Sequence, residues 1–261
     1  MTKRFVTQIT SYLMTAVAIM GPAPSVSLAS TPPGPSFGHP TNPNPGVLPI
    51  NSKPYGLSYG DWTAVWWQWV LSVPASNSPI GDKTGADCTQ HQFGPVWFLA
   101  GTSGGIVTRN CTVPVGTAIF FPILNYLNDY PCPVSPPAPP FEPDPGQSLE
   151  DFLTNGNANY PGARDLEDNP QELVATVDNV PLRNLVGYRA TSRLFYFKAD
   201  SSYVGGGDPC INGHLQPGVS DGYWIMLTPL PPGIHTIEFT GVGAGGGFIT
   251  GVKYNLKVVG H

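Results

Sequence analysis

Apolar residues recur every three to four positions between residues 58 and 71, which is the spacing of an amphipathic helix. Ser58 precedes this run and Asp61 follows three residues later, a pattern typical of a helix start, while Pro74 ends the helix. Three tryptophans share one face of the helix: Trp62, Trp66 and Trp69. We expect this face to pack against the core of the protein, because a tryptophan side chain buries a large apolar area.

The remaining pattern is typical of short β-strands separated by turns that are rich in glycine and proline. Residues 96–100 and 106–109 are apolar runs joined by Ser103-Gly104-Gly105, and they predict a hairpin. Residues 118–124 are apolar on both faces, so we expect a central strand that is covered on both sides. The last third of the chain adds further predicted strands at residues 173–177, 194–197, 223–227, 234–239 and 252–258, with another beginning at Leu182.

These elements predict an all-β, mainly antiparallel fold, which is a β-sandwich or jelly-roll-like single domain with one or two peripheral helices. A second helix is expected at residues 148–153, with Ser148 as its N-cap. Residues 131–146 contain eight prolines and no periodicity, which indicates a loop. The repeated crossover helices of a parallel α/β fold are absent from this pattern.

Two segments precede the single β-rich domain, which we place at residues 55–261. Residues 1–29 have a basic start with Lys3 and Arg4, then an apolar core at residues 12–20, and they end in Ser27-Leu28-Ala29. These are the parts of a secretory signal peptide. Residues 30–54 are rich in proline, glycine and asparagine and predict a flexible leader or a segment draped on the surface. We therefore expect an exported protein that is secreted or periplasmic.

The charge balance disfavours several partners. The chain has 12 basic and 17 acidic residues, and removing the signal peptide takes away two basic residues, which leaves a net charge of −7. Nucleic acids and anionic membrane surfaces favour clustered Lys and Arg, so we expect neither as a partner. No segment after residue 29 is apolar over the length of a transmembrane helix, and we expect a soluble product whose oligomeric state the sequence leaves open.

The chain has four cysteines, all beyond the signal peptide. An even number of cysteines in an exported chain predicts two disulfides, for which three connectivities exist. The chain contains no C-x-x-C pair, which disfavours a thiolate metal site as the alternative. The order along the chain favours the pairs Cys88 with Cys111 and Cys132 with Cys210.

Aromatic residues are the main candidates for ligand contacts. Trp67 and Gln68 lie off the apolar face of the first helix, so we expect them to be more accessible than the other helix residues. Tyr223 and Trp224 are further candidates if they are exposed beside a groove. An indole offers a flat apolar face and one N–H donor, which suits a sugar ring or another flat apolar ligand.

His235 is the remaining candidate. His235 alternates with Ile237 and Phe239, so we expect its side chain to point inward. It is then either a neutral core histidine, whose pKa lies below about 6.5, or a base in a site. The other histidines are scattered, and no nucleophile motif, metal site or cofactor site can be assembled from the sequence. The sequence leaves open whether loop carboxylates converge on a calcium ion or form a glycosidase pair, the candidates being Asp61, Asp82, Asp87, Asp129, Asp208 and Asp221.

Several short motifs together resemble a family of secreted bacterial proteins of uncharacterised function. The resemblance covers most of residues 55–259, and it implies a bacterial, extracytoplasmic protein but no reaction and no ligand. The motifs are Tyr59-Gly60-Asp61-Trp62 with Trp66-Trp67-Gln68-Trp69, residues 94–101 (GPVWFLAG), Cys111-Thr112-Val113-Pro114 with Phe120-Phe121-Pro122, and Asp221-Gly222-Tyr223-Trp224 with residues 230–237 (LPPGIHTI).

The sequence therefore leads to three hypotheses about the function. The leading hypothesis is a disulfide-stabilised, non-enzymatic β-protein that binds a glycan or another extracytoplasmic ligand through aromatic residues. The alternative is a secreted hydrolase whose carboxylates and His235 meet only in the fold. A structural role in the cell envelope is the third hypothesis.

Overall fold

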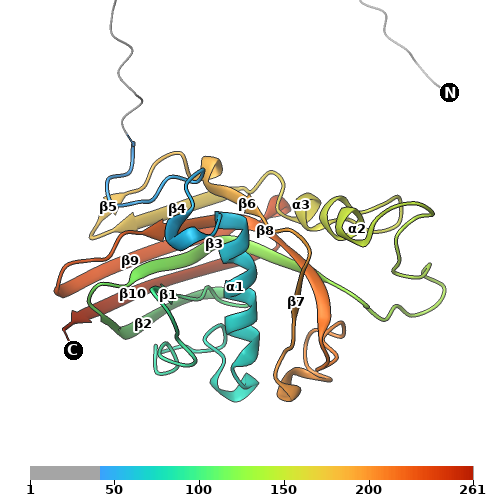
Figure 1. The fold of residues 1–261 in the computed structure, drawn as a ribbon, viewed down its shortest axis with the longest axis horizontal. Helices are drawn as coiled ribbons and strands as arrows, with labels where there is room; N and C mark the ends of the chain where they lie inside the picture. Colours follow the sequence, from blue (N-terminus) through green and yellow to red (C-terminus); the bar gives the residue numbers. More distant parts are fainter. Residues whose placement is uncertain (1–41, 261) are drawn as a thin grey trace, which may run out of the picture. The chain divides into compact units, whose positions relative to one another are not determined.

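The computed structural model describes residues 42–260, and this part of the chain is mostly β (Figure 1). Ten strands form two mixed five-stranded sheets. Sheet A contains β1 (Val96–Phe98), β3 (Ala118–Asp129), β8 (Gln216–Leu227), β6 (Arg189–Thr191) and β7 (Phe195–Phe197). Sheet B contains β2 (Gly105–Pro114), β10 (Ile249–Val259), β9 (Gly233–Val242), β4 (Glu172–Val177) and β5 (Val180–Pro181).

In the part of the chain that the structure describes, three α-helices accompany the sheets: α1 (Tyr59–Ser72), α2 (Leu149–Asn155) and α3 (Ala163–Leu166). Short 3₁₀ turns lie at Pro54–Gly56, Ala75–Asn77, Leu185–Tyr188, Ser201–Tyr203 and Ala244–Gly246. Within residues 42–260, no helix combines the length and the apolar character that a bilayer crossing requires.

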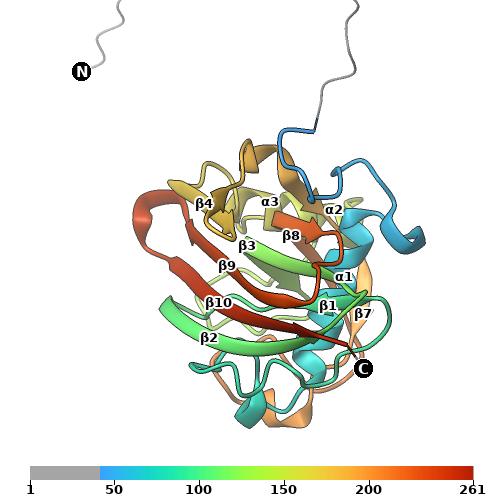
Figure 2. The same ribbon diagram turned by 90° about the vertical axis from the view of Figure 1, so that its left-hand side faces the viewer.

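Sheet A has a different covering on each of its faces. Figure 2 shows α1 on one side of β3 and β8, and β9, β10 and β2 of sheet B on the other. On the sheet B side, the ring of Phe121 in β3 stacks on Phe239 in β9 with 5.0 Å between the ring centroids. On the helix side, Trp66 of α1 meets Trp224 of β8. Sheet A therefore has strands of sheet B against one face and helix α1 against the other.

The sequence located most strands but not all of their partners. Six strand pairs are antiparallel, whereas β1 with β3 and β2 with β10 are parallel, so both sheets are mixed. The hairpin expected from residues 96–100 and 106–109 is wrong, because β1 belongs to sheet A and β2 to sheet B. The turn after Gly101 carries the chain from one sheet to the other. Hydrophobic periodicity identifies a strand, but it does not select the neighbour with which that strand pairs.

Helix α1 forms as its sequence predicts. The Ser58 side chain accepts a hydrogen bond from the backbone of Asp61, whose carboxylate accepts one from the Ser58 backbone, which completes a capping box. Trp62, Trp66 and Trp69 are buried, in agreement with the expected core face. Gly60 lets the helix approach β6 closely, because a Cβ there would lie 2.3 Å from the carbonyl oxygen of Thr191.

Residues 42–54, expected to be part of a flexible leader or to lie on the surface, pack against β8. Val47 is buried and forms a β-bridge with Leu227, and the Leu48 amide donates to the Met226 carbonyl at 2.8 Å. The hydroxyl of Tyr59 donates to the Leu48 carbonyl at 2.6 Å, which fixes this segment to α1. Of the two expectations for this segment, the contacts of residues 42–54 favour a segment that lies on the domain. The predicted signal peptide, residues 1–29, and residues 30–41 lie outside the described residues.

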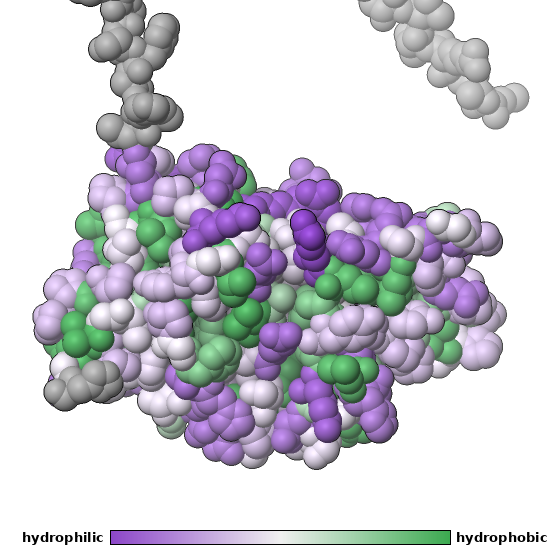
Figure 3. Space-filling model, in the orientation of Figure 1, coloured by the Kyte–Doolittle hydropathy of each residue, from purple (hydrophilic) through white to green (hydrophobic). Residues whose placement is uncertain are grey.

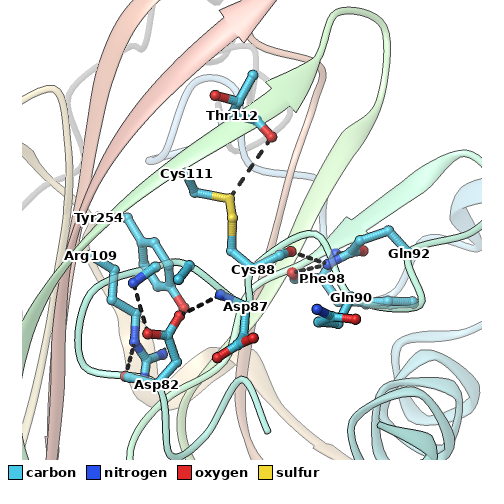
Figure 4. The surroundings of a disulfide bond; sticks show 12 residues. Asp82, Asp87, Cys88, Gln90, Gln92, Phe98, Arg109, Cys111, Thr112 and Tyr254 are labelled. Carbon is cyan, nitrogen blue, oxygen red and sulfur yellow. Dashed lines mark hydrogen bonds between the residues drawn. A yellow bond between two sulfur atoms is a disulfide. The ribbon is translucent and has the colours of Figure 1, made fainter. Parts of the chain in front are cut away.

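Both expected disulfides are present. Cys88 pairs with Cys111, which joins the segment after α1 to β2 (Figure 4). Cys132 pairs with Cys210, which joins the proline-rich loop after β3 to the loop that precedes β8. The protein is thus a disulfide-stabilised β-protein. The second bridge holds in place a loop that forms one wall of the cleft described next.

Candidate ligand-binding cleft

A cleft opens between α1, β3 and the loop that contains residues 203–211. Its main cavity has a volume of about 310 Å³, and an adjoining cavity measures about 180 Å³. Both cavities are lined by Trp67, Ile80, Ser103 and Asn125. On the face of the molecule that carries α1, hydrophobic residues form several separate areas among hydrophilic ones (Figure 3). The two cavities together have a size typical of small-molecule sites.

Trp67 forms one wall of the cleft. It lies off the core face of α1, as expected from the helical spacing, and it is half-buried. Its indole nitrogen donates to the hydroxyl of Ser220 at 3.0 Å, and its ring meets the ring of Trp66 edge to face at 5.0 Å between centroids. These contacts fix the orientation of the indole, so its apolar surface is already positioned at the cleft before any ligand arrives.

Asn125 supplies an unused polar group in the same cleft. The pairing of β3 with β8 shifts register between Pro122 and Leu124, which indicates a β-bulge at Ile123. A bulge inserts one residue, so the side chains after it turn to the opposite face of the sheet. Asn125 therefore lies on the side of Trp67, where its amide nitrogen is buried and has no hydrogen-bond partner within the described part of the chain.

Gly222 of β8 makes room for Asn125. It lies directly across from Asn125 in the register, and a Cβ at Gly222 would lie 2.8 Å from the Cβ of Asn125. Its φ of 155° adds to the preference for glycine. A buried amide without a partner costs free energy, and an acceptor on a ligand would remove that cost.

The cleft is acidic at one end. Asp208 and Tyr126 line both the main cavity and a further cavity of about 240 Å³, which also contains Asp129. Carboxylate oxygens of Asp129 and Asp208 lie within 4.8 Å of each other. Burial, together with the negative charge of Asp208, raises the pKa of Asp129 to about 7. Gln216 holds Asp129 through its side-chain amide, which donates at 2.5 Å.

A metal ion fits this acidic end poorly. The third potential ligand of the group is Cys210, whose sulfur is bonded to Cys132 and so cannot serve as a thiolate. The two remaining carboxylates offer fewer oxygens than the six to eight that a calcium ion takes. Of the carboxylates that the sequence left as calcium candidates, Asp129 and Asp208 are the two that lie together at this end of the cleft.

Arg109 positions two loops that border the cleft (Figure 4). It is buried in β2, and its guanidinium donates to carbonyl oxygens of both loops and to the hydroxyl of Tyr254 at 2.8 Å. The carbonyl acceptors are Ile80 at 3.0 Å, Asp82 at 2.7 Å, Ala100 at 2.7 Å and Gly101 at 3.1 Å. Because Ile80 and the turn after Ala100 line the cleft, Arg109 couples the inter-sheet core to the cleft wall.

Three of the predicted ligand contacts lie elsewhere. Gln68 is exposed, and its side-chain amide donates to the carbonyl of Tyr196 at 2.8 Å, which links α1 to β7. Tyr223 and Trp224 are 4% and 0% exposed, so they do not meet the condition of exposure beside a groove on which their candidacy depended. The reason is that β8 is the central strand of sheet A and is covered on both faces. Trp224 stacks on Phe120 with 5.1 Å between centroids and is part of the core.

His235 also differs from its expected role. Its side chain is only 11% exposed, but it lies near the start of β9 and forms an ion pair with Asp178 rather than packing as a neutral core residue. Nδ1 lies 2.7 Å from the Asp178 carboxylate and Nε2 lies 2.9 Å from the Pro231 carbonyl. Burial alone would lower its pKa, but these two acceptors raise the pKa of His235 above its usual value. His235 lines neither cavity of the cleft.

This ion pair predicts the sign of a pH effect on stability. A group whose pKa is raised in the folded state stabilises the protein fully below its unfolded value of about 6.5 and loses that contribution as pH rises through the folded pKa. In His235→Gln, we expect urea-unfolding free energies to vary less between pH 6 and 8 than in the parent. Asp178→Asn should flatten the profile in the same way. A parent whose stability instead increases over this interval would contradict the assignment.

The other candidate carboxylates do not converge on the cleft. Asp61 caps α1, Asp82 accepts hydrogen bonds from its own loop, and Asp87 accepts one from Asn77. Asp221 is fully buried and forms an ion pair with Arg189 at 2.7 Å. No pattern in the sequence points to Asn125, because its place in the site depends on the bulge.

Comparisons with known proteins give no further guide to this cleft. The chain matches no protein-family model, no curated protein and no solved structure.

Proposed function

We propose that this protein is an exported ligand-binding protein whose cleft takes a ring-shaped extracytoplasmic ligand, such as a glycan unit or another surface component. The carrying observation is the fixed Trp67 indole beside the unpartnered amide of Asn125. A flat apolar face with one convergent polar donor is the usual chemistry of a small-ligand site. The proposed ligand stacks on Trp67 and accepts a hydrogen bond from Asn125.

Export is supported by the features of residues 1–29 and by two disulfides, which form and persist in oxidising compartments. The resemblance to secreted bacterial proteins agrees with this placement. We therefore propose that the ligand is a component of the extracytoplasmic space or of the cell surface.

Trp67→Ala tests the proposal. On a glycan array and in a thermal-shift panel of ring compounds, the parent should bind at least one ligand that Trp67→Ala binds about fivefold more weakly or worse, since stacking contributes about 1 kcal/mol or more. Gln68→Ala is the matched control, because Gln68 is the next residue of α1 but does not line the cleft. Equal loss in both variants, or binding unchanged in Trp67→Ala, would contradict the proposal.

One observation favours hydrolysis as a second candidate function. Asp129 and Asp208 form a close pair in which one pKa is raised to about 7, as in a general acid beside an ionised carboxylate. His235 takes no part in this pair. Turnover of a chromogenic glycoside that disappears in Asp129→Asn would support hydrolysis, and its absence across a panel of glycosides would favour binding alone.

A further inference from the structure

The acidic end of the cleft has no cation of its own. Within residues 42–260, neither Asp129 nor Asp208 forms an ion pair with a Lys, Arg or His side chain. Their polar contacts are neutral: Gln216 donates to Asp129, and the Cys210 amide donates to Asp208 at 2.9 Å. Asp221, in contrast, is buried with Arg189 as its partner. Placing two carboxylates together without a cation costs free energy unless a partner is supplied.

The negative charge reaches the aromatic part of the cleft. Burial, followed by the charges of Asp208 and Asp129, raises the pKa of the Tyr126 hydroxyl. Tyr126 and Asp208 line the main cavity that Trp67 also lines. One continuous wall therefore presents an indole, a phenol ring and then two carboxylates. Aromatic faces and carboxylates both attract a positive charge, and a compact cation can contact both.

We propose that the ligand of this cleft is a ring compound carrying a protonated amine, with the ring against Trp67 and the amine directed to Asp208 and Asp129. This assignment rests on the proposed function, because it names the ligand class of the same cleft. The ring stacks on the indole, the amine donates to the carboxylates, and a hydroxyl or carbonyl on the ring accepts from Asn125. Two sources offer this chemistry: an aromatic amine and an amino sugar.

A matched set of probes separates the contributions. Phenethylamine, 2-phenylethanol and phenylacetate share one ring and differ in head group, and glucosamine with glucose forms the corresponding sugar pair. Isothermal titration at pH 8 keeps Asp129 ionised, since this pH lies above its pKa of about 7. We expect at least one amine to bind about tenfold more tightly than its uncharged analogue, as one charge-assisted hydrogen bond predicts. Phenylacetate should bind most weakly of the aromatic set.

Variants locate the charge effect. Asp208→Asn and Asp129→Asn retain the size of the side chain and should each reduce the preference for the amine about tenfold, with little change for the uncharged analogue. Asp87→Asn is the control, because Asp87 is a half-buried carboxylate that does not line the cleft. Circular dichroism of each variant verifies that it is folded. Phenethylamine as the preferred probe identifies the aromatic source, and glucosamine identifies the sugar source.

The outcomes distinguish the two proposals. Probes that bind in a Trp67-dependent manner without preferring the amine would overturn the assignment of a cationic ligand and leave the proposed cleft intact. A preference for the amine that persists in both Asp208→Asn and Asp129→Asn would also overturn it. Failure of all five probes to bind at millimolar concentration, with no Trp67-dependent ligand in the wider panel, would count against both proposals.

Discussion

Replacing Trp66 by alanine should lower the free energy of unfolding by about 3 to 5 kcal/mol, the usual cost of removing a fully buried aromatic side chain. Trp66 is 1% exposed, and its ring contacts Trp69 and Trp224 with centroid distances of 5.8 and 5.4 Å. Its indole nitrogen donates to the Leu99 carbonyl at 2.9 Å, and this carbonyl would lose its donor in the variant. The midpoint of urea unfolding and the thermal midpoint both measure the effect.

Gln68→Ala provides the comparison within the same helix, because Gln68 is exposed and alanine favours the helix. Its stability should lie within about 0.5 to 1 kcal/mol of the parent, allowing for the lost hydrogen bond to Tyr196. An unchanged midpoint in Trp66→Ala would show that α1 contributes little to the core. In that case the whole helix, and not only Trp67, would be available to a ligand.

Arg109→Met should also cost about 3 to 5 kcal/mol, because methionine fills much of the space but leaves buried carbonyls without donors, each worth about 1 to 3 kcal/mol. The carbonyls of Ile80, Asp82 and Gly101 would each lose the guanidinium. The Ala100 carbonyl would retain its hydrogen bond from Tyr254 at 2.9 Å. Chemical unfolding measures the loss of stability.

Arg109→Lys separates charge from geometry. Lysine keeps the positive charge but has one nitrogen in place of the planar fork, so it cannot reach both loops at once. We expect a stability between those of the parent and Arg109→Met, and weaker binding of any cleft ligand, because Ile80 and the turn after Ala100 form the cleft wall. A methionine variant as stable as the parent would show that other donors reach these carbonyls.

These variants connect the core with the cleft. Trp66 lies on the buried face of α1 and contacts the Trp67 ring. Arg109 donates hydrogen bonds to the two loops that line the cleft near Ile80 and Gly101. The shape of the cleft thus depends on buried groups of the core, one of which, Trp66, also lines the adjoining cavity. This rigidity reduces the conformational entropy that a ligand would have to remove on binding.

Much of the fold could be read from local patterns. The helix start at Ser58, the buried face with Trp66 and the doubly covered strand at residues 118–124 follow from periodicity, and the structure has all three. The partners of β1 and β2 could not be read in this way, because pairing depends on contacts between segments distant in the chain. Alternation predicted an inward His235, but the upward shift of its pKa depends on Asp178, a residue of another segment.

By itself, the sequence determined the mainly β composition, the position of α1, the face that α1 buries and the presence of two disulfides. Each depends on spacing along the chain or on the number of cysteines, and both are local properties. Only the tertiary structure decided that Tyr223 and Trp224 are buried while Trp67 borders a cleft. It also placed Asn125 beside Trp67 through a one-residue bulge and brought Asp129 to Asp208 across a long separation. The physical reason is that burial, strand register and the meeting of loops are set by packing between segments, which no single stretch of sequence encodes.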